Sequence, residues 1–513
     1  MLVKTFAAAV SGISATIITI EVSCTKGIQF FLVGLPDVAV RESHERIISA
    51  LQVNGYKFPR SRIVINMAPA DIRKEGSAYD LPLAIGVLAG AGDIDSGLLD
   101  KYMLMGELSL DGSLHPVKGA LPIAIKAREE GFKGFILPRK NAYEAAVVDQ
   151  LEVFGVDNIK EVIEFFSGKT LLEPTIVDTR KDFFDKSQFF DNDFSDVRGQ
   201  ENVKRALEVA AAGGHNLIMV GPPGSGKSML AKRLPTILPP LSLQEALETT
   251  KIHSVAGKIS EHTSLLSQRP FRAPHHTISN VAMVGGGSYP QPGEISLAHN
   301  GILFLDELPE FNRNVLEVLR QPLEDRHINI SRARFAVDYP AGFMLIASMN
   351  PCPCGFYNHP TRPCACPPGA VQKYLNRISG PLLDRIDIQI EITPVPFEKI
   401  SEQKPSESSA DVRDRVIKAR EIQKKRFELH KGTHCNAQMS SKLLHQYAVP
   451  DNDGLSLLKN AMQRLNLSAR AYDRILKLSR TIADLEESEN IKSHHLAEAI
   501  NYRNLDRESW GST

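Results

Sequence analysis

The sequence predicts an α/β multidomain protein with an α+β N-terminal domain, a P-loop α/β core and a helical C-terminal region. Strand-like and helix-like runs mix over residues 1–172. From Asp196 onward a helix, a short apolar strand, a glycine-rich loop and another helix follow one another, as in nucleotide-binding parallel sheets. Apolar residues then recur at helical spacing between Ile475 and Leu485, which indicates one buried helix face.

The N-terminal domain is expected to begin with a strand at residues 15–22, which are rich in β-branched residues and partly alternate. The alternative is a signal peptide, because residues 6–20 are mostly apolar. Serines and threonines interrupt that run, however, and no small-residue cleavage site follows it. Further strands are expected at 62–67, 103–105 and 134–137, and helices at 42–53 and 121–130.

Composition and charge indicate an ordinary globular protein. Apolar residues make up 42% and charged residues 23% of the 513 residues, enough for two or three domains. Lys plus Arg and Asp plus Glu both total 60, so a polyanionic partner would have to be held by local patches. No apolar run reaches the length of a membrane span. We therefore expect a cytoplasmic protein with no membrane contact.

Changes in composition divide the chain. Residues 176–195 are acidic and carry phenylalanine pairs, which we expect to dock on a neighbour while the segment serves as a linker. Residues 394–411 hold three prolines and four serines and are expected to be a second linker. The expected segments are 1–175 (N-terminal domain), 176–195 (linker), 196–393 (core, with a cysteine-rich insert at 351–368), 394–411 (linker) and 412–505 (helical region).

A P-loop follows the apolar residues 217–220 and reads GPPGSGKS. Its glycines let backbone N–H groups wrap phosphates, and the start of the next helix adds a positive dipole. We expect Lys227 to neutralise the β and γ phosphate oxygens and Ser228 to place its hydroxyl on Mg²⁺. The expected ATP-binding residues are Gly221, Pro222, Pro223, Gly224, Ser225, Gly226, Lys227, Ser228 and Asp306.

Two acids end the next apolar strand, at residues 302–305. Asp306 is expected to hold Mg²⁺ through water, together with Ser228, and Glu307 to polarise the attacking water. A lone Asp-Glu pair could instead cap a helix. Asn350, after a third strand at residues 343–348, is placed to touch the γ-phosphate.

Two arginines, Arg385 and Arg470, are candidates for stabilising transferred charge. An isolated arginine is more often a solvated surface residue, so only its place among motifs favours a role. The motifs are GPPGSGKS, PGEISLAHNGILFLDELPEF, SMNPCPCG, SGPLLDRIDI and SARAYDRILKLSRTIADLE. Together they resemble the magnesium-chelatase-like AAA+ ATPases of the ComM/YifB type, over essentially the whole chain.

This resemblance implies catalytic roles: sensor 1 for Asn350, an arginine finger for Arg385 and sensor 2 for Arg470 on a helical lid. A finger that reaches a neighbouring subunit's ATP implies a ring, here a homo-hexamer. The resemblance also implies an insert at 272–293 that projects toward the ring channel and a hairpin at 326–339; in related ring helicases such loops touch DNA. The alternative is that the hairpin arginines are only a solvated face.

A basic stretch in the C-terminal region offers a further DNA contact. Residues 413–431 hold eight Lys or Arg against three acids, which suits phosphate binding. An ordinary exposed helix is the alternative.

The N-terminal domain is similar to the Lon-protease-type (ribosomal S5 domain 2-like) domain through GELSLDGSLHPVKGAL and GFKGFILPRKN. Ser77 lies where the protease keeps its serine. The catalytic lysine position falls on Leu121 or Pro122, and Lys118 is displaced by about one helical turn. A Ser–Lys dyad needs an amine beside the hydroxyl, so we expect a non-proteolytic scaffold.

Four of the six cysteines form two close pairs that bracket nine residues. Two such pairs can enclose one Zn²⁺ tetrahedrally, with His359 as a spare ligand. Four free thiols in a proline-rich loop are the alternative. The expected zinc ligands are Cys352, Cys354, Cys364 and Cys366.

The resemblance implies an ATP- and Mg²⁺-dependent DNA motor, a branch-migration helicase of homologous recombination and natural transformation. Its expected partners are single-stranded and branched DNA, its own copies in a homo-hexamer and recombination proteins. A chelatase-type motor subunit is one alternative; it leaves the Lon-like domain unexplained and lacks a D-x-S-x-S motif here. An ATP-dependent protease is the other, disfavoured by the missing lysine. DNA-stimulated ATPase activity separates the first from both.

Overall fold

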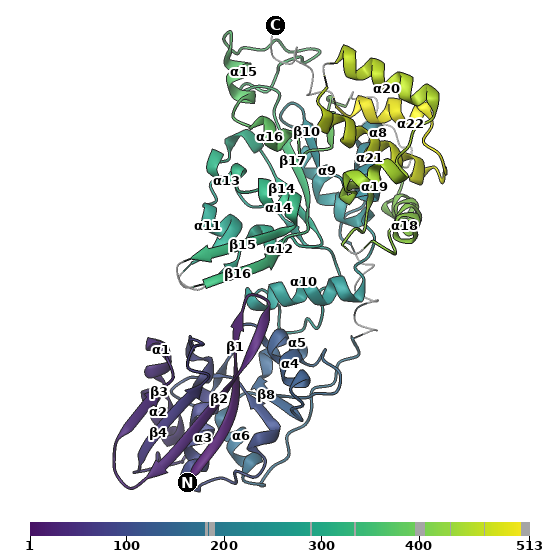
Figure 1. Cartoon of the computed structure of the whole chain (residues 1–513). Coiled ribbons are helices and arrows are strands. Elements are labelled where there is room, and N and C mark those ends of the chain that lie inside the picture. Colours follow the sequence, from purple (N-terminus) through teal and green to yellow (C-terminus); the bar gives the residue numbers. More distant parts are fainter. Residues whose placement is uncertain are drawn as a thin grey trace.

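The computed structural model shows an α/β multidomain protein, as predicted (Figure 1). An N-terminal domain, a core with a parallel sheet and a C-terminal group of helices follow one another along the chain. The structure describes residues 1–179, 183, 190–287, 290–332, 335–395, 406–430, 432–465 and 467–503, with only the backbone at 332 and 335.

The N-terminal domain is built on a mixed sheet with strand order β3-β4-β2-β1-β5-β8-β9. β1 and β2 form a long antiparallel hairpin, in which Leu2 pairs with Ser23 and Ser11 with Ser14. On the other side of β1, strands β5, β8 and β9 run parallel to it and to one another. The strands span Leu2–Ser11 (β1), Ser14–Thr25 (β2), Phe30–Val33 (β3), Arg62–Ala68 (β4), Tyr102–Leu104 (β5), Glu107–Leu108 (β6), Leu114–His115 (β7), Gly134–Pro138 (β8) and Glu152–Val156 (β9).

The prediction that residues 15–22 form the first strand is wrong, because they lie within β2 and β1 precedes them. The apolar run 6–20 belongs to both strands of this hairpin. β1 carries three consecutive alanines, which have low strand propensity, but it pairs on both sides and buries Ala7 and Ala8 completely or nearly so. Tertiary pairing therefore overrides local propensity here.

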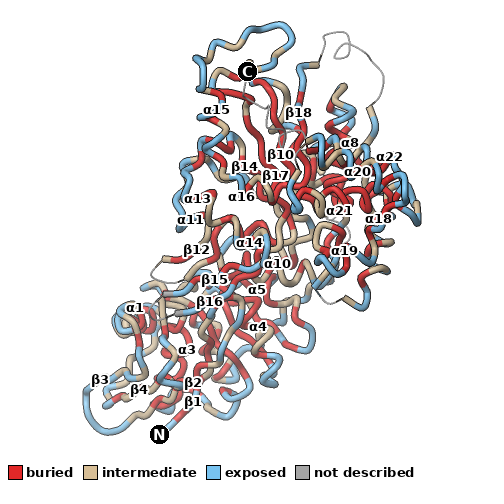
Figure 2. Tube along the Cα trace, turned by 45° about the horizontal axis from the view of Figure 1, so that its top comes forward, coloured by how far each residue is buried: buried red, intermediate tan, exposed pale blue. Residues whose placement is uncertain are grey.

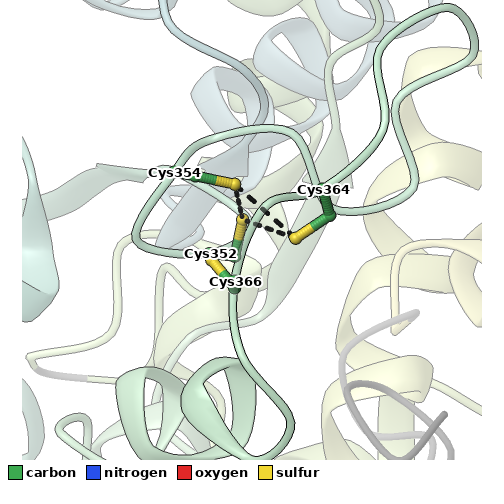
Figure 3. A group of neighbouring side chains, drawn as sticks. All are labelled: Cys352, Cys354, Cys364 and Cys366. Atoms are coloured by element: carbon green, nitrogen blue, oxygen red, sulfur yellow. Dashed lines mark hydrogen bonds between the residues drawn. The ribbon is translucent and has the colours of Figure 1, made fainter.

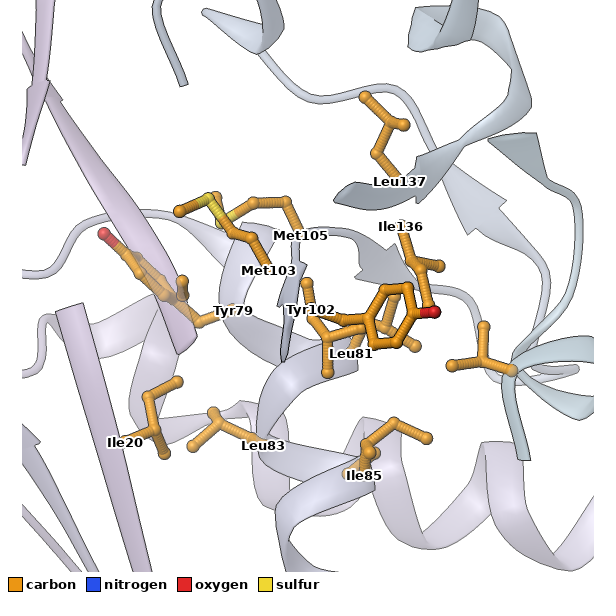
Figure 4. Close-up of a cluster of buried hydrophobic side chains, with 14 of the residues drawn as sticks. Ile20, Tyr79, Leu81, Leu83, Ile85, Tyr102, Met103, Met105, Ile136 and Leu137 are labelled. Carbon is orange, nitrogen blue, oxygen red and sulfur yellow. The ribbon is translucent and has the colours of Figure 1, made fainter. Parts of the chain in front are cut away.

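Helices pack on this sheet, and the hydrophobic core of the domain lies between them and the strands. α3 packs across β1 and β2, and Figure 4 shows Leu81, Leu83 and Ile85 of α3 gathered with Ile20 of β2 and Met103 of β5. α3 is buried along nearly its whole length, which explains its almost continuous apolar sequence. The helices span Val38–Arg41 (α1), Ser43–Val53 (α2), Asp80–Ala91 (α3), Ala120–Glu129 (α4), Arg139–Ala145 (α5) and Ile159–Phe166 (α6).

The core has a five-stranded, all-parallel sheet with order β11-β14-β17-β10-β18. β10, β14 and β17 are buried at every position (Figure 2), as expected for strands covered on both faces. Two small antiparallel hairpins extend from this sheet. The strands span Leu217–Val220 (β10), Phe271–Arg272 (β11), Gly285–Gly286 (β12), Gln291–Pro292 (β13), Ile302–Leu305 (β14), His327–Arg332 (β15), Phe335–Pro340 (β16), Met344–Met349 (β17) and Ile388–Glu391 (β18).

Helices surround the core sheet and continue into the C-terminal region, where α18 and α21 pack against α8. The C-terminal helices span Ser409–Arg426 (α18), Ser441–Tyr447 (α19), Asn452–Arg464 (α20), Ala469–Leu485 (α21) and Ser493–Asn501 (α22). Those of the core span Glu201–Gly213 (α8), Lys227–Arg233 (α9), Leu243–Val255 (α10), Asn280–Val284 (α11), Glu294–Leu297 (α12), Arg313–Glu317 (α13), Arg320–Asp325 (α14), Ala370–Leu375 (α15) and Gly380–Leu383 (α16).

α10 joins the N-terminal domain to the core (Figure 1). It packs on α4, and the buried Glu144 of α5 accepts a hydrogen bond from the Ser254 hydroxyl of α10. The expected phenylalanine docking is seen at Phe183, which is buried with Leu241, Ala246 and Leu265. The other phenylalanine of its pair, at position 184, and much of the second linker lie outside the described residues.

No helix in the described part of the chain is both long enough and apolar enough to cross a membrane.

Candidate functional site

The candidate site lies at the carboxyl ends of three adjacent parallel strands. β17 lies between β10 and β14, so the P-loop after β10, Asp306 after β14 and Asn350 after β17 meet at one edge of the sheet. This edge is where ligands bind in open parallel sheets. The sequence places the three motifs far apart, and the strand order brings them together.

Lys227 lies at the centre of the site. Its Nζ donates to the Gly221 and Pro222 carbonyls at 2.7 and 2.9 Å and to Asn350 Oδ1 at 3.3 Å. Burial lowers the pKa of Lys227, and the carboxylates of Asp306 and Glu307 act to raise it. The amine is therefore held among carboxylate, amide and carbonyl oxygens, within reach of the loop that would wrap a phosphate.

The P-loop itself requires glycine at two positions, since Gly224 and Gly226 have φ of 79° and 88°. Ser225 Oγ is buried, and among the described residues no group offers it a hydrogen bond. A buried hydroxyl without a partner is costly, and a nucleotide phosphate oxygen would supply one. The loop thus fits the phosphate chain that its sequence predicts.

Asp306 is organised by two hydroxyl groups. Ser228 Oγ donates to its Oδ2 at 2.6 Å, and Ser348 Oγ donates to its Oδ1. Ser348 is fully buried on β17 and was not among the predicted site residues. Ser228 and Asp306 therefore form an adjacent oxygen pair of the kind that Mg²⁺ prefers.

Glu307 is more than half exposed and has a left-handed backbone, with φ of 54°. Its Oε2 lies 3.7 Å from His276 Nδ1. His276 belongs to the predicted insert at 272–293 and stacks on His275, with ring centroids 4.1 Å apart. Sequence reasoning missed this contact, because nothing in the PHHT stretch signals a carboxylate partner.

A cavity of about 570 Å³ opens beside the P-loop. Residues 222–226 form one side of it. Asp196, Val197, Arg198, Gln200, Met229, Leu230, Phe356, His359, Thr361, Arg362, Pro394 and Val395 complete the lining. The volume falls within the usual range for small-molecule pockets.

The structure does not bring the two predicted arginines to this cavity: neither is among its described lining residues. Arg385 is buried and pairs with Glu324, while its Nε has no partner among the described residues. Arg470 is exposed and pairs with Asp384 at 3.1 Å. Their roles in hydrolysis therefore stay predictions.

The four cysteines cluster as predicted (Figure 3). All four sulfur atoms lie within 4.8 Å of one another, and three Sγ–Sγ distances are 3.3, 3.5 and 3.7 Å. The edge of a tetrahedron of sulfurs around Zn²⁺ is about 3.8 Å, whereas a disulfide bond is about 2.05 Å. The cluster thus has the dimensions of a metal site rather than of disulfides.

Backbone N–H groups surround these sulfurs. Tyr357 N donates to Cys352 Sγ at 3.3 Å. Burial acts to raise the pKa of the Cys354 thiol, but hydrogen bonds from the backbone of Phe356 and Ala365 lower it to about 6. Burial and the neighbouring thiols raise the pKa of Cys352 and Cys366 instead, so a metal ion binding all four sulfurs would have to displace protons from the cluster.

His359 is not the spare ligand that we expected. Its Nδ1 accepts hydrogen bonds from the backbone N–H groups of Thr361 and Arg362, at 3.2 and 3.1 Å. The candidate metal-binding group at this place contains the four cysteines and not His359. His359 instead lines the cavity beside the P-loop.

Several of the arginines expected to contact DNA form hydrogen bonds or ion pairs within the chain. Arg326 is half-buried and donates to the Gly432 carbonyl at 3.0 Å, and position 334 lies outside the described residues. On α18, Arg415 pairs with Glu208 and Glu407, and Arg426 pairs with Asp484. These arginines hold α18 to its neighbours, while Lys424 and Lys425 are exposed. Phosphate contact by this helix therefore stays a prediction, beside the alternative of an ordinary exposed helix.

The predicted serine of the N-terminal domain, Ser77, begins a short 3₁₀ helix ahead of α3. The Lys118 side chain lies against Gly257 of the core: a Cβ built at Gly257 would be 3.3 Å from Lys118 Cε. Lys118 therefore belongs to the contact between the domains.

Comparison with known proteins agrees with this site. Residues 193–400 match the family described as magnesium chelatase, subunit ChlI, and residues 406–503 its C-terminal family. The YifB protein of Escherichia coli is 45% identical over 97% of this chain and 96% of its own length. Competence protein ComM of Haemophilus influenzae is 43% identical over the same shares. The chain belongs to the magnesium-chelatase-like ComM/YifB family.

Membership of this AAA+ family indicates ATPase activity and implies ATP and Mg²⁺. Residues 20–141 of this ComM/YifB protein match the family described as subunit ChlI of Mg-chelatase, so a chelatase-named family does extend over the N-terminal domain. That removes one of the two sequence arguments against the chelatase alternative.

Two shorter similarities concern the alternatives. Lon protease 2 of Bacillus subtilis is 29% identical over 157 residues, or 28% of this chain. The magnesium-chelatase 38 kDa subunit of Rhodobacter capsulatus is 27% identical over 177 residues, or 31% of this chain. Neither of these two spans a third of this ComM/YifB protein.

Proposed function

We propose that this protein is a homo-hexameric AAA+ ATPase that drives branch migration of DNA in homologous recombination, notably during natural transformation. The observation that carries the proposal is the full-length similarity to a competence protein, joined to the Lys227, Asp306 and Asn350 arrangement at one sheet edge. Such a motor acts on single-stranded and branched DNA in the cytoplasm, beside recombination proteins.

Each residue of the site has a separate role in ATP hydrolysis. The P-loop and Lys227 bind the phosphates, and Ser228 with Asp306 hold Mg²⁺, which when bound neutralises phosphate charge. Glu307 accepts a proton from the attacking water, and Asn350 orients that water. His276 holds the Glu307 carboxylate before catalysis.

In the proposed ring, two arginines supply positive charge that stabilises the phosphate during hydrolysis. Arg385 acts on the nucleotide of a neighbouring subunit, and Arg470 acts as the second sensor on a lid formed by the C-terminal helices. In the single chain, Glu324 and Asp384 hold these two arginines. The Arg470–Asp384 pair is exposed on both sides, so lid movement can exchange it at small cost. Arg385 is buried although Glu324 is exposed, so contact with a neighbouring subunit has to draw it out.

The N-terminal domain serves as a Lon-like scaffold without proteolytic activity. Lys118 lies at the core contact, which agrees with the missing catalytic amine. α10 contacts α4 of this domain and α12 and β13 of the core, so it links the two parts.

The cysteine cluster holds one Zn²⁺ per chain. Four sulfurs at tetrahedral spacing and N–H donors to Cys352 and Cys354 support this. Metal analysis of reduced protein, purified without chelator, should give about one zinc per chain. A metal-free result from such a preparation, with no uptake of added Zn²⁺, would remove zinc from the proposal.

DNA-stimulated ATPase activity tests the function. Single-stranded or branched DNA should raise ATP hydrolysis, and Lys227→Ala should abolish both basal and stimulated rates. ATP hydrolysis that responds instead to a porphyrin and a chelatase partner, and not to DNA, would favour the chelatase-type motor.

A further inference from the structure

We propose that the metal ion bound by the four cysteines sets the affinity of this protein for its nucleotide, because the loop between the cysteine pairs forms a wall of the nucleotide's base pocket. The proposal rests on the proposed ATPase function and deepens it. It assigns Phe356 and Arg362 as base-contacting residues and makes the metal a regulator of ATP binding.

The cysteine loop lies directly against the P-loop. A Cβ built at Gly355 would lie 2.5 Å from Cδ and 2.9 Å from Cγ of Pro223. Gly355 also has φ of 85°, which favours glycine. Close backbone approach therefore joins the residue after Cys354 to the third residue of the phosphate-binding loop.

The same loop directs an aromatic and a cationic side chain to the cavity beside the P-loop. Phe356, His359 and Arg362 all line it. Arg362 Cζ lies 5.3 Å from the Phe356 ring centroid, and the His359 ring meets that ring edge-on at 5.5 Å. These contacts hold the three side chains as one unit.

The chemistry of this wall suits a nucleotide base. P-loop residues 222–226 line the cavity, whereas Ser228 and Asp306, the expected Mg²⁺ pair, are not among its described lining residues. Val197, Pro394 and Val395 provide apolar surface there. A flat base can stack on an aromatic ring or a guanidinium plane, so Phe356 and Arg362 are placed to bind it.

The metal ligands flank these pocket residues closely. Phe356 follows Cys354 by two positions, and Arg362 precedes Cys364 by two. All six cysteines are free thiols, so in the chain without metal no covalent link closes the loop. One ion bound to all four sulfurs closes it and removes the conformational freedom that base binding would otherwise have to remove.

Coupling of this kind is reciprocal. If the metal raises nucleotide affinity by some factor, nucleotide raises metal affinity by the same factor. A purely structural metal that lies beside the pocket without contributing to it would show neither effect.

The test is equilibrium binding of a fluorescent, non-hydrolysable ATP analogue to the full chain in the presence of Mg²⁺. Three forms are compared: protein as purified, protein stripped with a chelator that is then removed, and stripped protein reloaded with Zn²⁺. We expect stripped protein to bind about tenfold more weakly, the usual weight of one base–aromatic stack, and reloading to restore the affinity.

Single substitutions distinguish a loss of nucleotide contacts in the pocket from a loss of folding. Phe356→Ala and Arg362→Ala should each weaken binding about fivefold or more while zinc content stays unchanged. Arg377→Ala is the matched control, because Arg377 also covers a ring, that of Tyr374 at 5.9 Å, but is not among the described lining residues. These variants decide the question even if cysteine variants fail to fold.

The reciprocal measurement is competition for Zn²⁺ with a chromophoric chelator, with and without the analogue. Equal analogue affinity in stripped and reloaded protein would overturn the proposal and leave the ATPase function standing. If zinc-loaded protein binds the analogue no better than Lys227→Ala, the ATPase function itself fails. Tight metal binding with no change on adding nucleotide would mark the ion as structural only.

Discussion

At the scale of single residues, each charged side chain of the site is held by polar groups next to it. Lys227 is held by two carbonyls and Asn350, Asp306 by two hydroxyl groups, and Glu307 by His276. The side chains expected to bind phosphate and metal are thus held by neighbours from other parts of the chain. Glu307 is the most exposed of them, which suits the water-activating role that we propose for it.

Glu307→Gln should retain ATP binding and lower the hydrolysis rate by about 10²–10⁴-fold, because an amide cannot accept a proton from water. Binding and steady-state turnover are measured on the same preparation. Glu310→Gln is the matched control, since Glu310 lies three residues on and pairs with Arg377. Wild-type turnover in Glu307→Gln would refute the catalytic assignment.

Arg385→Ala should leave nucleotide affinity nearly unchanged and lower hydrolysis by about 10³-fold or more, the loss typical of arginine fingers, if Arg385 has the proposed role. Mixing decides whether it acts between subunits. Rings that combine Arg385→Ala with Glu307→Gln subunits should recover activity, because some interfaces then pair an intact Arg385 with an intact Glu307. Verified mixed rings without recovery would argue against action in trans.

At the scale of elements, a buried charge network joins the core to the C-terminal helices. Asp387, just before β18, pairs with Arg474 of α21 at 2.8 Å and with His215 at 3.1 Å. Burial acts to raise the pKa of Asp387, but Arg474 and His215 hold it well below its usual value. Three residues earlier, Asp384 makes an exposed pair with Arg470 of the same helix.

Asp387→Asn should destabilise the chain by about 3–5 kcal/mol, because it removes the buried charge that holds the partly buried Arg474 and the fully buried His215. Asp384→Asn is the control and should cost roughly 0–1 kcal/mol. Thermal unfolding of the full chain measures both. The Asp387 contribution is present above about pH 4, the ordinary carboxyl pKa, and is lost as the pH falls below it. Equal midpoints for the two variants would contradict this account.

Local patterns were sufficient for some elements and not for others. The P-loop strand and helix could be predicted, since the glycine spacing and the apolar run act within twelve residues. β1 could not, because its alanines gain their strand conformation from β2 and β5. The hydrogen bond from Arg326 to the Gly432 carbonyl could not be predicted either, because it joins residues far apart in the chain.

At the scale of the whole molecule, the N-terminal domain is firmly attached to the core. Gly119 N donates to the Ser254 carbonyl at 3.1 Å, and the buried Glu144 accepts from the Ser254 hydroxyl. Deleting residues 1–175 would expose α10, so substitutions within the domain test its role more cleanly than truncation.

Ser77→Ala should leave ATP hydrolysis and DNA activity unchanged, because the position expected for the catalytic lysine holds Leu121 or Pro122, which have no amine to activate this serine. ATP-dependent degradation of casein is assayed beside them. Degradation by the wild type that disappears in Ser77→Ala would replace the scaffold with a protease.

The cysteine cluster shows what sequence can and cannot give about a site. The paired spacing predicted four ligands, and the structure brings their sulfurs together. The spacing could not show that Phe356 and Arg362 line the cavity beside the P-loop, because that depends on how the loop packs on Pro223. The contact of His276 with Glu307 could not be predicted either, because it depends on how two distant segments of the chain pack together.

The central claim, an ATP-driven DNA motor, is tested most directly by disruption of a synthetic four-way DNA junction. Wild-type protein with ATP and Mg²⁺ should convert the labelled junction to duplex products, and Glu307→Gln should bind the junction without converting it. Wild-type protein that hydrolyses ATP at the same rate with and without the junction, and leaves the junction intact, would contradict the account.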